Sequence, residues 1–533
     1  MKKIIKIFVM LFMLTSLVAC GSGNKGASSG DYKLENVKFP LKEKLSLKMM
    51  INSSPLAPKD PNEKAIFKRL EEETNLHIDW TNYTNDFVEK RNLDIASGDL
   101  PDAIWNAAAS DIDILQWAKS KVIVPVDELI DKYMPNLKKI YEENPQYKKM
   151  ATAPDGKMYT FPWIEELGEK EYSIHTVNDM AWINTDWLKK LNLEMPKNPQ
   201  DLLNVLKAFK EKDPNGNGKQ DEIPLSFIDN PGNEDFKILI AAFGGDGDND
   251  DHLVVGDDGK LNFTADDKAY RDAISYFHEL EKNGLIDPEA FEQDWNTYIA
   301  KGKEHKYGVY FTWDKANVSG MNDSYDVLPV LEGPNGEKNI TRTNNIGFSR
   351  DTFVITSKNK NLELTARWID KMYEPLQSVQ NNWGTYGEEG QNIFELVEKN
   401  GHKSLEHMPL EGTAPGELRQ KTEVRGPLAV LDDYYGDYTT MPDDAKWRID
   451  LIKEYYSEYV KHKNIYPRVF MSAEDAEKIA QIDADLFPYI ERKRAEFIKS
   501  GITDKTWDEY IKELDRLGLK KWLSIKQKYY DEY

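Results

Sequence analysis

Apolar and polar residues alternate along residues 45–52, and the stretch then turns apolar, which is the pattern of a β-strand. Residues 63–74 instead repeat their apolar positions along one side of a helix. A second short strand at 77–80 and a second helix at 87–97 follow. This alternation of strands and helices predicts an α/β fold with a mostly parallel sheet covered by helices on both faces.

Polar residues follow two of the predicted strands. Asn52 and Ser53 come at the end of the first strand, and Asn106 follows an apolar strand at 103–105. Ligands of parallel α/β sheets bind beyond the carboxyl ends of the strands. We therefore expect these three residues to lie at a ligand cleft, although a plain loop role is equally open for each of them.

The second half of the chain has longer helical patterns. Residues 200–210 form an amphipathic helix after Pro199, and residues 223–227 have the pattern of a strand. The last third is helical and highly charged, with apolar stripes within residues 443–462, 472–500 and 506–533. Alternating charge of this kind is typical of a solvated helix face, so it indicates no function.

An acidic loop with two glycines, residues 213–222, lies between that amphipathic helix and the strand. Oxygen-bearing side chains occur at alternate positions and Gly218 stands sixth, which is the spacing of an EF-hand-type calcium loop. The match ends at the twelfth position, where Pro224 replaces the usual bidentate carboxylate; Glu222 at position ten is the nearest substitute. A metal-free turn rich in Asn, Asp and Gly is the alternative interpretation.

A second acidic run, residues 244–251, also has the composition of a metal site. It precedes a hairpin pattern at 253–261 that contains an Asp-Gly turn. We interpret this run as a solvated loop.

The chain begins with the features of an export signal. Lysines occur within residues 1–6 and an almost wholly apolar run covers 7–19, which is too short to span a bilayer. The residues before Cys20 resemble a bacterial lipobox, in which the cysteine is lipidated and becomes the mature N-terminus. A secreted protein with an incidental cysteine is the alternative. Residues 21–30 have the composition of a flexible tether, and the expected lipidated N-terminus and tether together cover residues 20–44.

Composition narrows the classes of function. The chain of 533 residues has a net charge of −22, which argues against nucleic acid or an anionic membrane surface as a direct partner. Its single cysteine excludes an intramolecular disulfide. The 13 tryptophans and 27 tyrosines are notable, because many stand near predicted strand ends and loops.

Several segments, in the same order, resemble extracellular solute-binding lipoproteins of ABC sugar importers (the family 1 type). The similarity is to the large calcium-binding subgroup that takes up oligosaccharides. The segments are SGDLPDAIW (97–105), VIVPVDELI (122–130), PDGKMYTFPW (154–163), MAWINTDWLKKLNL (180–193), DPNGNGKQDEIPL (213–225), NGLIDPE (283–289), YGVYFTWD (307–314) and TFVITS (352–357). The resemblance covers nearly all of the chain after the signal.

This resemblance implies a two-lobed clamp of the periplasmic-binding-protein type II, with hinge crossovers and a helical C-terminal part. It implies a first lobe of residues 45–150 and 325–357 and a second lobe of residues 151–324 and 358–533. The ligand binds between the lobes, which close on it. The permease and the ATPase are separate chains, so the protein would bind and deliver its ligand without catalysis, as a lipid-anchored monomer outside the cell membrane.

The family pattern also implies the ligands of a structural calcium ion. Side-chain oxygens would come from Asp213, Asn215, Asn217, Asp221 and Glu222, and Lys219 would supply its carbonyl oxygen. Three carboxylates among these ligands are enough to offset a divalent charge.

The prediction that the ligand is a sugar rests on aromatic residues. A sugar ring lays its apolar face on an indole while its hydroxyls need planar acceptors alongside. Trp313 and Asp314 offer this pairing directly after an apolar strand, and Trp383, Tyr386 and Glu388 offer it in a glycine-rich loop.

Trp163 and Trp182 follow or lie on predicted strands and are further candidates. Other tryptophans stand at helical spacing and are assigned to packing: Trp117, Trp187, Trp368 and Trp447.

Two other functions remain as alternatives. A lipid-anchored glycoside hydrolase would need two carboxylates across the scissile bond, and the adjacent Glu388 and Glu389 are a poor pair. A surface adhesin or receptor for glycans is the other alternative. Among possible ligands, neutral plant-type glycans such as fructo-oligosaccharides are favoured over uronates, because the loops placed at the cleft contain few basic residues; a peptide or another small solute stays open.

Overall fold

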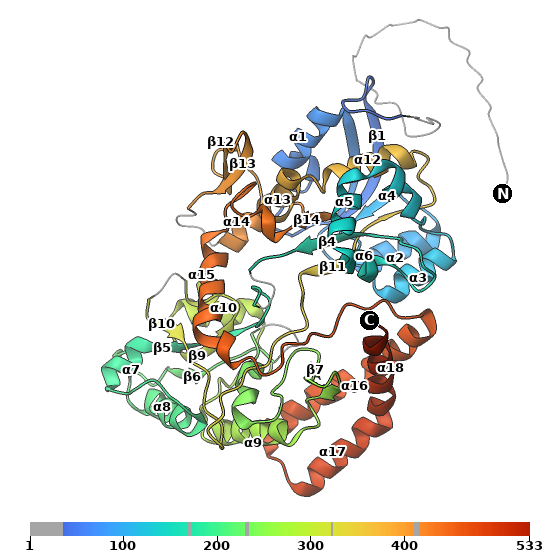
Figure 1. Ribbon diagram of the computed structural model, residues 1–533. Helices are drawn as coiled ribbons and strands as arrows, with labels where there is room; N and C mark the ends of the chain where they lie inside the picture. The colour runs from blue at the N-terminus through green and yellow to red at the C-terminus, as the bar shows by residue number, and fades with distance from the viewer. Residues whose placement is uncertain (1–35, 169–171, 230–233, 321–322, 410–414) are drawn as a thin grey trace, which may run out of the picture.

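The computed structural model describes residues 36–168, 172–229, 234–320, 323–409 and 415–533. Two lobes, each built around its own sheet, lie one above the other in Figure 1. The upper lobe has a six-stranded sheet and the lower lobe a four-stranded sheet. The two-lobed α/β fold predicted from the sequence is confirmed.

The upper sheet has the strand order β14-β4-β11-β3-β1-β2. β1 pairs in parallel with β2 and β3, and β14 pairs in parallel with β4. β11 runs antiparallel to both of its neighbours, β3 and β4. The bounds of these strands are β1 (Leu45–Asn52), β2 (Leu76–Tyr83), β3 (Ala103–Trp105), β4 (Phe161–Glu165), β11 (Phe348–Ile355) and β14 (Leu428–Val430).

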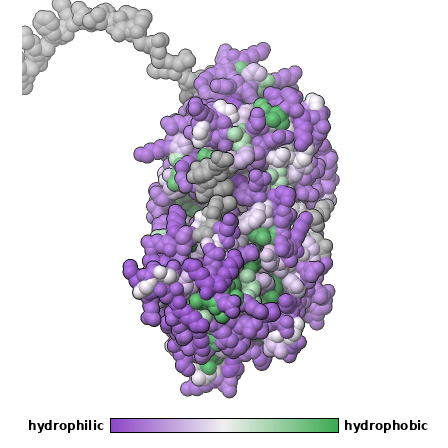
Figure 2. Space-filling model, turned by 90° about the vertical axis from the view of Figure 1, so that its left-hand side faces the viewer, coloured by the Kyte–Doolittle hydropathy of each residue, from purple (hydrophilic) through white to green (hydrophobic). Residues whose placement is uncertain are grey.

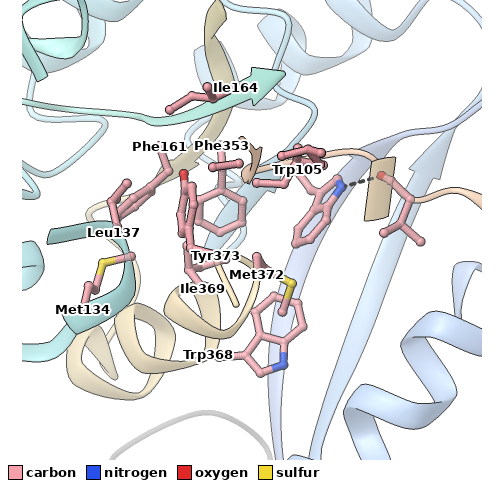
Figure 3. Packing of buried hydrophobic residues seen from close by; sticks show 14 of the residues in the cluster. Trp105, Met134, Leu137, Phe161, Ile164, Phe353, Trp368, Ile369, Met372 and Tyr373 are labelled. Carbon is pink, nitrogen blue, oxygen red and sulfur yellow. Dashed lines mark hydrogen bonds between the residues drawn. The ribbon is translucent and has the colours of Figure 1, made fainter. Parts of the chain in front are cut away.

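Trp105, at the end of β3, lies in the centre of the upper core (Figure 3). Its ring is fully buried, with centroids 5.9 Å from Phe353 and 5.8 Å from Trp368. Its indole Nε1 donates a hydrogen bond of 2.9 Å to the carbonyl of Val424, drawn as a dashed line in Figure 3. A buried indole N–H needs such a partner, so this bond fixes the chain around Val424 to the end of β3.

The lower sheet has the strand order β10-β5-β9-β6. β5 pairs antiparallel with β9 and β10, and β6 pairs in parallel with β9. The bounds are β5 (Met180–Asn184), β6 (Ile223–Leu225), β9 (Tyr307–Thr312) and β10 (Tyr325–Val327). Two small hairpins complete the strands: β7 (Leu253–Val255) with β8 (Leu261–Phe263), and β12 (Phe394–Lys399) with β13 (His402–His407).

The helices of the upper lobe are α1 (Ala65–Thr74), α2 (Phe87–Ser97), α3 (Asp111–Lys119), α4 (Asp127–Tyr133), α5 (Pro135–Glu143), α6 (Pro145–Ala151), α12 (Leu362–Lys371), α13 (Pro375–Trp383) and α14 (Pro415–Thr422). Those of the lower lobe are α7 (Thr185–Leu191), α8 (Pro199–Glu211), α9 (Lys268–Lys282), α10 (Trp295–Lys303) and α11 (Ala316–Ser319). α15 (Asp443–Leu451) lies between the two groups in Figure 1.

Three C-terminal helices belong to the lower lobe: α16 (Ala473–Ser500), α17 (Asp504–Leu517) and α18 (Leu519–Glu532). The predicted apolar stripe of α16 is buried and packs against α9. The helical pattern over 506–533 forms two helices, α17 and α18, and not one. They are separated at Gly518, whose φ of 108° lies in the left-handed region that favours glycine.

The expected lobe boundaries need correction. β4 and β14 were assigned to the second lobe, yet both are strands of the upper sheet, and α12 and α13 pack into the upper core. β10 was assigned to the first lobe, yet it pairs with β5 of the lower sheet. Pairing between segments hundreds of residues apart decides these assignments, and no local pattern encodes it.

The chain crosses between the sheets after β4, after β10 and again before α16. Arg350 on β11 ties two of these connections together and is 2% exposed. Its guanidinium is paired with Asp111 at 2.7 and 2.9 Å and donates to the carbonyls of Arg468 and Val469 at 2.8 and 3.0 Å. The crossover segment before α16 is therefore bonded to the upper lobe through a buried, charge-assisted network.

Hydrophilic residues cover most of the face drawn in Figure 2, with hydrophobic residues in small groups. Within the described residues, no helix is long and apolar enough to cross a membrane. The expected signal peptide (1–19) and the lipidation site Cys20 lie outside the described residues, as does most of the tether.

Candidate ligand cleft and calcium loop

Two adjoining cavities lie at the carboxyl ends of the upper strands. The smaller, of about 620 Å³, is lined by the upper lobe alone, and the larger, of about 950 Å³, is lined by both lobes. They share four lining residues: Ala108, Trp163, Ser349 and Asp351. A cleft of this volume between two lobes is the size of site that small organic ligands occupy.

Three predicted ligand residues meet at the smaller cavity. Asn52 ends β1, Ser53 follows it, and Asn106 follows the adjacent strand β3. The Asn106 side chain donates to the carbonyl of Asn52 at 3.0 Å, and the Ser53 hydroxyl donates to Asn82 Oδ1 at 2.7 Å. The parallel pairing of β1 with β3 brings these strand ends together, as the sequence pattern predicts.

Trp163 on β4 is half-buried and lines both cavities. Its Nε1 donates to Asn382 Oδ1 at 2.9 Å, and Asn382 Nδ2 donates to Glu165 Oε1 at 2.5 Å. Burial opposes ionisation of Glu165, but the neighbouring His175, 3.4 Å away, and the hydrogen bond from Asn382 outweigh it and hold the pKa of this carboxyl below its usual value. The indole is thus held in a fixed orientation at the junction of the cavities.

The turn at Glu423–Gly426 forms another wall of the smaller cavity, and sequence reasoning missed it. Arg425 has a φ of +51°, its side chain is 64% exposed, and its Nε lies 2.8 Å from Glu423 Oε1. Lys64 donates to the carbonyl of Glu423 from the other side. Long-range bonds, among them the one from Trp105 to Val424, bring this turn to the cleft, so no local signal in the sequence could have found it.

The other predicted sugar-binding residues line neither cavity. Trp182 is 1% exposed and stacks on Trp447 at 5.6 Å, so it offers no ring face to a ligand and belongs with the packing tryptophans. Trp383 is also buried, with the guanidinium of Arg419 4.7 Å from its ring.

Tyr386 lies against the guanidinium of Arg69 at 4.1 Å, and Glu388 is exposed in the following loop. Both belong to the upper lobe near β12, where Tyr386 forms a bridge with Phe394. The glycine-rich loop that contains them is therefore placed away from the two cavities.

Trp313 and Asp314 follow β9 and are half-buried. The guanidinium of Arg448 lies 3.5 Å from the Trp313 ring centre and donates to the carbonyl of Val177 at 2.6 Å. Burial lowers the pKa of Arg448 to about 9. Asp314 accepts a hydrogen bond of 2.8 Å from the backbone N–H of Ala316. The contacts of Arg448 connect α15 to the segment between β4 and β5. Trp313 and Asp314 therefore contribute to packing in the region between the lobes.

The predicted calcium loop is a tight turn after α8. Asp213, Gly216 and Gly218 all have positive φ. Asp213 Oδ1 accepts from the backbone N–H of Gly216 at 2.9 Å and of Asn217 at 3.1 Å, and Oδ2 accepts from Gly218 at 3.0 Å. The loop thus wraps around its first carboxylate, as a loop that encloses a cation does.

The remaining side chains of the loop close it from the other side. The amides of Asn215 and Asn217 donate to Asp221 Oδ1 at 3.0 and 2.9 Å. In the part of the chain that the structure describes, no three Asp, Glu, His or Cys side chains converge as metal ligands, this loop included. Both carboxylate oxygens of Glu222 are buried and have no hydrogen-bond partner among the described residues, and burial raises the pKa of this carboxyl.

An unpartnered buried carboxylate is costly unless a cation or a proton compensates it. A calcium ion would supply that charge, and a half-turn of the Asn215 and Asn217 amides would present their oxygens to it. The residues of this loop therefore fit a calcium ion in number and kind.

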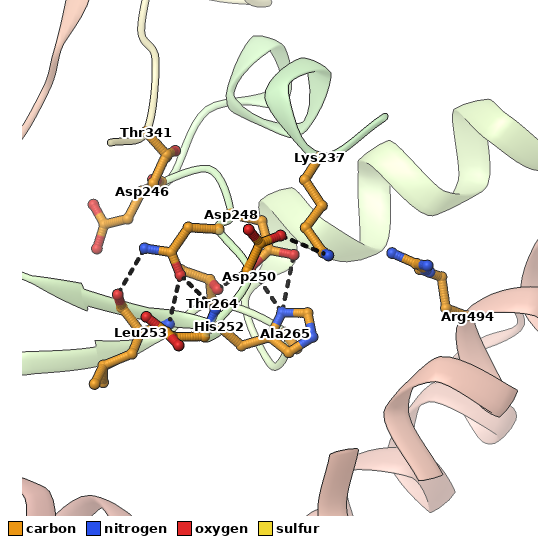
Figure 4. Close-up of polar contacts among 12 residues, drawn as sticks. Lys237, Asp246, Asp248, Asp250, His252, Leu253, Thr264, Ala265, Thr341 and Arg494 are labelled. Atoms are coloured by element: carbon orange, nitrogen blue, oxygen red, sulfur yellow. Dashed lines mark hydrogen bonds and ion pairs between the residues drawn. The ribbon is translucent and has the colours of Figure 1, made fainter. Parts of the chain in front are cut away.

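The second acidic run, residues 244–251, is not the solvated loop that its composition indicates. Asp248 is 3% exposed; it is bonded to His252 Nδ1 at 2.8 Å and accepts from the Thr264 hydroxyl (Figure 4). Asp250 is paired with Lys237 at 3.1 Å. The solvated-loop interpretation is wrong, because Lys237 before the run, His252 directly after it and Thr264 after β8 supply partners to its buried carboxylates inside the lower lobe.

Comparison with known proteins places the chain in a family. Residues 54–377 match the family of bacterial extracellular solute-binding proteins. The chain is 67% identical over 521 residues to the fructooligosaccharide ABC transporter substrate-binding protein FusA of Streptococcus pneumoniae serotype 4, covering 98% of this chain and 96% of that protein. The chain belongs to the family of bacterial extracellular solute-binding proteins.

Solved structures of FusA have the same fold. FusA in complex with kestose matches with a TM-score of 0.88 and 67% identity, over 92% of this chain and 99% of that one. A FusA EF-hand mutant in complex with fructo-nystose matches with a TM-score of 0.88 and 66% identity, over the same shares of the two chains. The existence of that mutant shows that FusA has an EF-hand.

Proposed function

We propose that this protein is the substrate-binding component of an ABC importer for fructo-oligosaccharides. The observation that carries the proposal is the cleft beyond the strands of the upper sheet, with Trp163 at the junction of its two cavities. The similarity to FusA supplies the class of ligand, because FusA binds kestose and fructo-nystose. The protein would capture such a sugar between its lobes and deliver it to a membrane permease.

The charges around the cleft favour a neutral ligand. In the smaller cavity Glu423 and Asp351 balance Arg425 and Lys64. In the larger cavity the carboxylates outnumber the cations; the lining residues are Asp111, Asp250, Asp251, Asp351 and Asp483 against Arg350, Arg468 and Lys526. A uronate would meet no excess of positive charge there. The cleft is richer in basic residues than the sequence pattern indicated; of these, Arg350 is paired with Asp111 and Arg425 with Glu423.

Binding without turnover follows from how the carboxylates of the smaller cavity are engaged. Glu423 is paired with Arg425, and Asp351 accepts a hydrogen bond from the Ser349 hydroxyl. Both carboxylates are thus engaged by neighbouring side chains, whereas a glycosidase needs two carboxyls available across the scissile bond. We infer that the protein is not an enzyme; a surface glycan receptor without a permease is the alternative.

Titration calorimetry with kestose, nystose and an oligogalacturonide tests the ligand. We expect the two fructans to bind and the uronate to give no heat. Small-angle scattering with and without kestose should show a smaller radius of gyration for the complex, because hinged lobes close on the ligand, and a mass equal to one chain. Release of fructose during incubation would contradict the proposal, as would heat from the uronate alone.

We propose further that Cys20 is lipidated and anchors the protein to the outer face of the cell membrane through the tether. Cys20→Ala should release the protein into the medium of the producing cells, whereas the neighbouring tether variant Asn24→Ala should stay with the membrane fraction. Retention of Cys20→Ala in the membrane fraction would contradict the anchor.

The loop at 213–222 would hold a structural calcium ion. Its proposed ligands are side-chain oxygens of Asp213, Asn215, Asn217, Asp221 and Glu222 and the carbonyl of Lys219. Support comes from the two unpartnered oxygens of Glu222 and from the EF-hand of FusA. The loop is followed directly by β6 and not by a second helix, which suits a rigid structural site in the lower lobe. At the millimolar calcium found outside cells, even a weak site of this kind is filled.

A further inference from the structure

We infer that Arg425 is a specificity-determining residue of the cleft, which donates paired hydrogen bonds to two neighbouring hydroxyls of the sugar that lies on Trp163. The inference rests on the proposed function for its ligand class. It depends on three features of the structure: a backbone conformation that arginine disfavours, the contacts that hold it, and the two donors that it leaves facing the cavity.

The backbone of Arg425 is held in a disfavoured conformation. A non-glycine residue with a φ of +51° is strained, and strained residues of this kind concentrate at functional sites. The next residue, Gly426, is also in the left-handed region with a φ of +83°, and a Cβ there would stand 2.2 Å from the Trp105 ring. The turn is therefore pressed against the upper core and cannot relax away from it.

Three contacts from different parts of the upper lobe hold this turn. The backbone N–H of Arg425 donates to the carbonyl of Asn381 at 2.8 Å, and Trp105 Nε1 donates to the carbonyl of Val424 at 2.9 Å. Lys64 donates to the carbonyl of Glu423. None of these contacts uses the guanidinium, so the fold would retain the turn if the arginine side chain were removed.

The guanidinium itself is oriented by one ion pair. Glu423, whose side chain is 9% exposed, accepts from Arg425 Nε at 2.8 Å and raises the pKa of the arginine. Among the described residues, no hydrogen bond joins Nη1 or Nη2 of Arg425 to a protein acceptor. An arginine fixed through Nε presents these two donors side by side, in the fork geometry that suits a pair of adjacent oxygens.

Adjacent hydroxyls on a sugar ring are such a pair. The ring face would lie on Trp163, which lines the same cavity, while the fork reaches the hydroxyls at its edge. The net charge of the Arg425–Glu423 pair is zero, so the arginine acts as a donor without attracting a uronate. This arrangement would select the neutral sugar by the position of its hydroxyls.

The test is kestose affinity together with thermal stability for Arg425→Gly and Arg425→Lys. Glycine removes the donors, so we expect kestose affinity to fall about 10- to 100-fold. The relieved φ offsets part of the stability lost when Glu423 loses its partner, so the melting temperature should stay within a few degrees of that of the unmodified protein. Lysine keeps the charge but not the fork, so it should restore little of the affinity.

Lys121→Gly is the matched control. Lys121 is an exposed cation with a φ of +56° that lines neither cavity. Lys121→Gly should relieve the same kind of backbone strain and leave kestose affinity unchanged. Unchanged affinity in Arg425→Gly would overturn the inference, as would a melting temperature several degrees lower, which would indicate a structural role. If the unmodified protein bound neither kestose nor nystose, the proposed function itself would fail.

Discussion

Two acidic, glycine-containing loops of the lower lobe have nearly the same composition and opposite structures. The loop at 213–222 leaves Glu222 buried without a hydrogen-bond partner among the described residues. In the run at 244–251 the buried carboxylate of Asp248 is bonded to His252 and Thr264, and Asp250 to Lys237. On our proposal, the first loop takes its compensating charge from an ion in solution, whereas the second has its compensation built in. The spacing of oxygen-bearing residues distinguishes them, because acidic composition alone does not.

The largest effect should come from removing a built-in partner. Lys237→Met would leave Asp250 without its cation and Asp235 with Arg494 alone. Breaking one side of a buried ion pair costs about 3–5 kcal/mol of stability. Urea unfolding with calcium and with EDTA should give the same loss in both conditions, since no ion from solution is involved. A loss that appears only with EDTA would remove the distinction between the loops.

Chelation should have the next largest effect, and it acts on the other loop. A ligand that binds only the folded state stabilises that state by about 2.7 kcal/mol when its free concentration is about one hundred times its Kd. EDTA should therefore lower the melting temperature more than it weakens kestose binding, because the loop lines neither cavity of the cleft. A melting curve unchanged by EDTA would disprove the calcium assignment.

Glu222→Gln should abolish the dependence of the melting temperature on calcium. Asp258→Asn, an exposed acid in the β7–β8 turn, is the control and should leave that dependence intact. A calcium response retained in Glu222→Gln would mean that Glu222 is not a ligand.

The smallest effect is the dependence on pH in EDTA. Burial raises the folded-state pKa of Glu222 above its usual value of 4.5. A carboxyl with a raised pKa holds its proton more tightly in the folded state. The stabilisation that Glu222 contributes to the folded state is therefore fully present below pH 4.5, and it is lost as the pH rises through the folded-state pKa. The stability difference between Glu222→Gln and the unmodified protein should grow over that interval, and calcium should reverse its sign. A difference constant with pH would show that Glu222 is solvated.

The parts of the fold that local patterns encode were predictable. The alternation of β1 and the one-sided helix α1 gave the start of a parallel sheet, and the strand ends then placed Asn52, Ser53 and Asn106 at the smaller cavity. Trp163 was predicted on different grounds, as an aromatic residue on or after a strand, although its strand β4 was assigned to the other lobe.

The missed features depend on distant partners. Arg425 reaches the cleft because Trp105, 319 residues earlier in the chain, holds the carbonyl of Val424. Trp182 was misassigned because its ring is covered by Trp447 of α15, a contact that no spacing reveals. The β4–β14 pairing that moved the lobe boundaries is of the same kind.

That β4–β14 pairing also sets the order in which the molecule can be completed. The upper sheet begins with the first strand of the chain, but β4 has a free edge until Leu428–Val430 has been made. At about 5–20 residues per second, the ribosome needs roughly 13 to 53 s to travel from the end of β4 to β14. The upper lobe, whose first strand is synthesised first, is therefore completed late. A chain truncated before Leu428 would present an unpaired strand edge, which is an aggregation site.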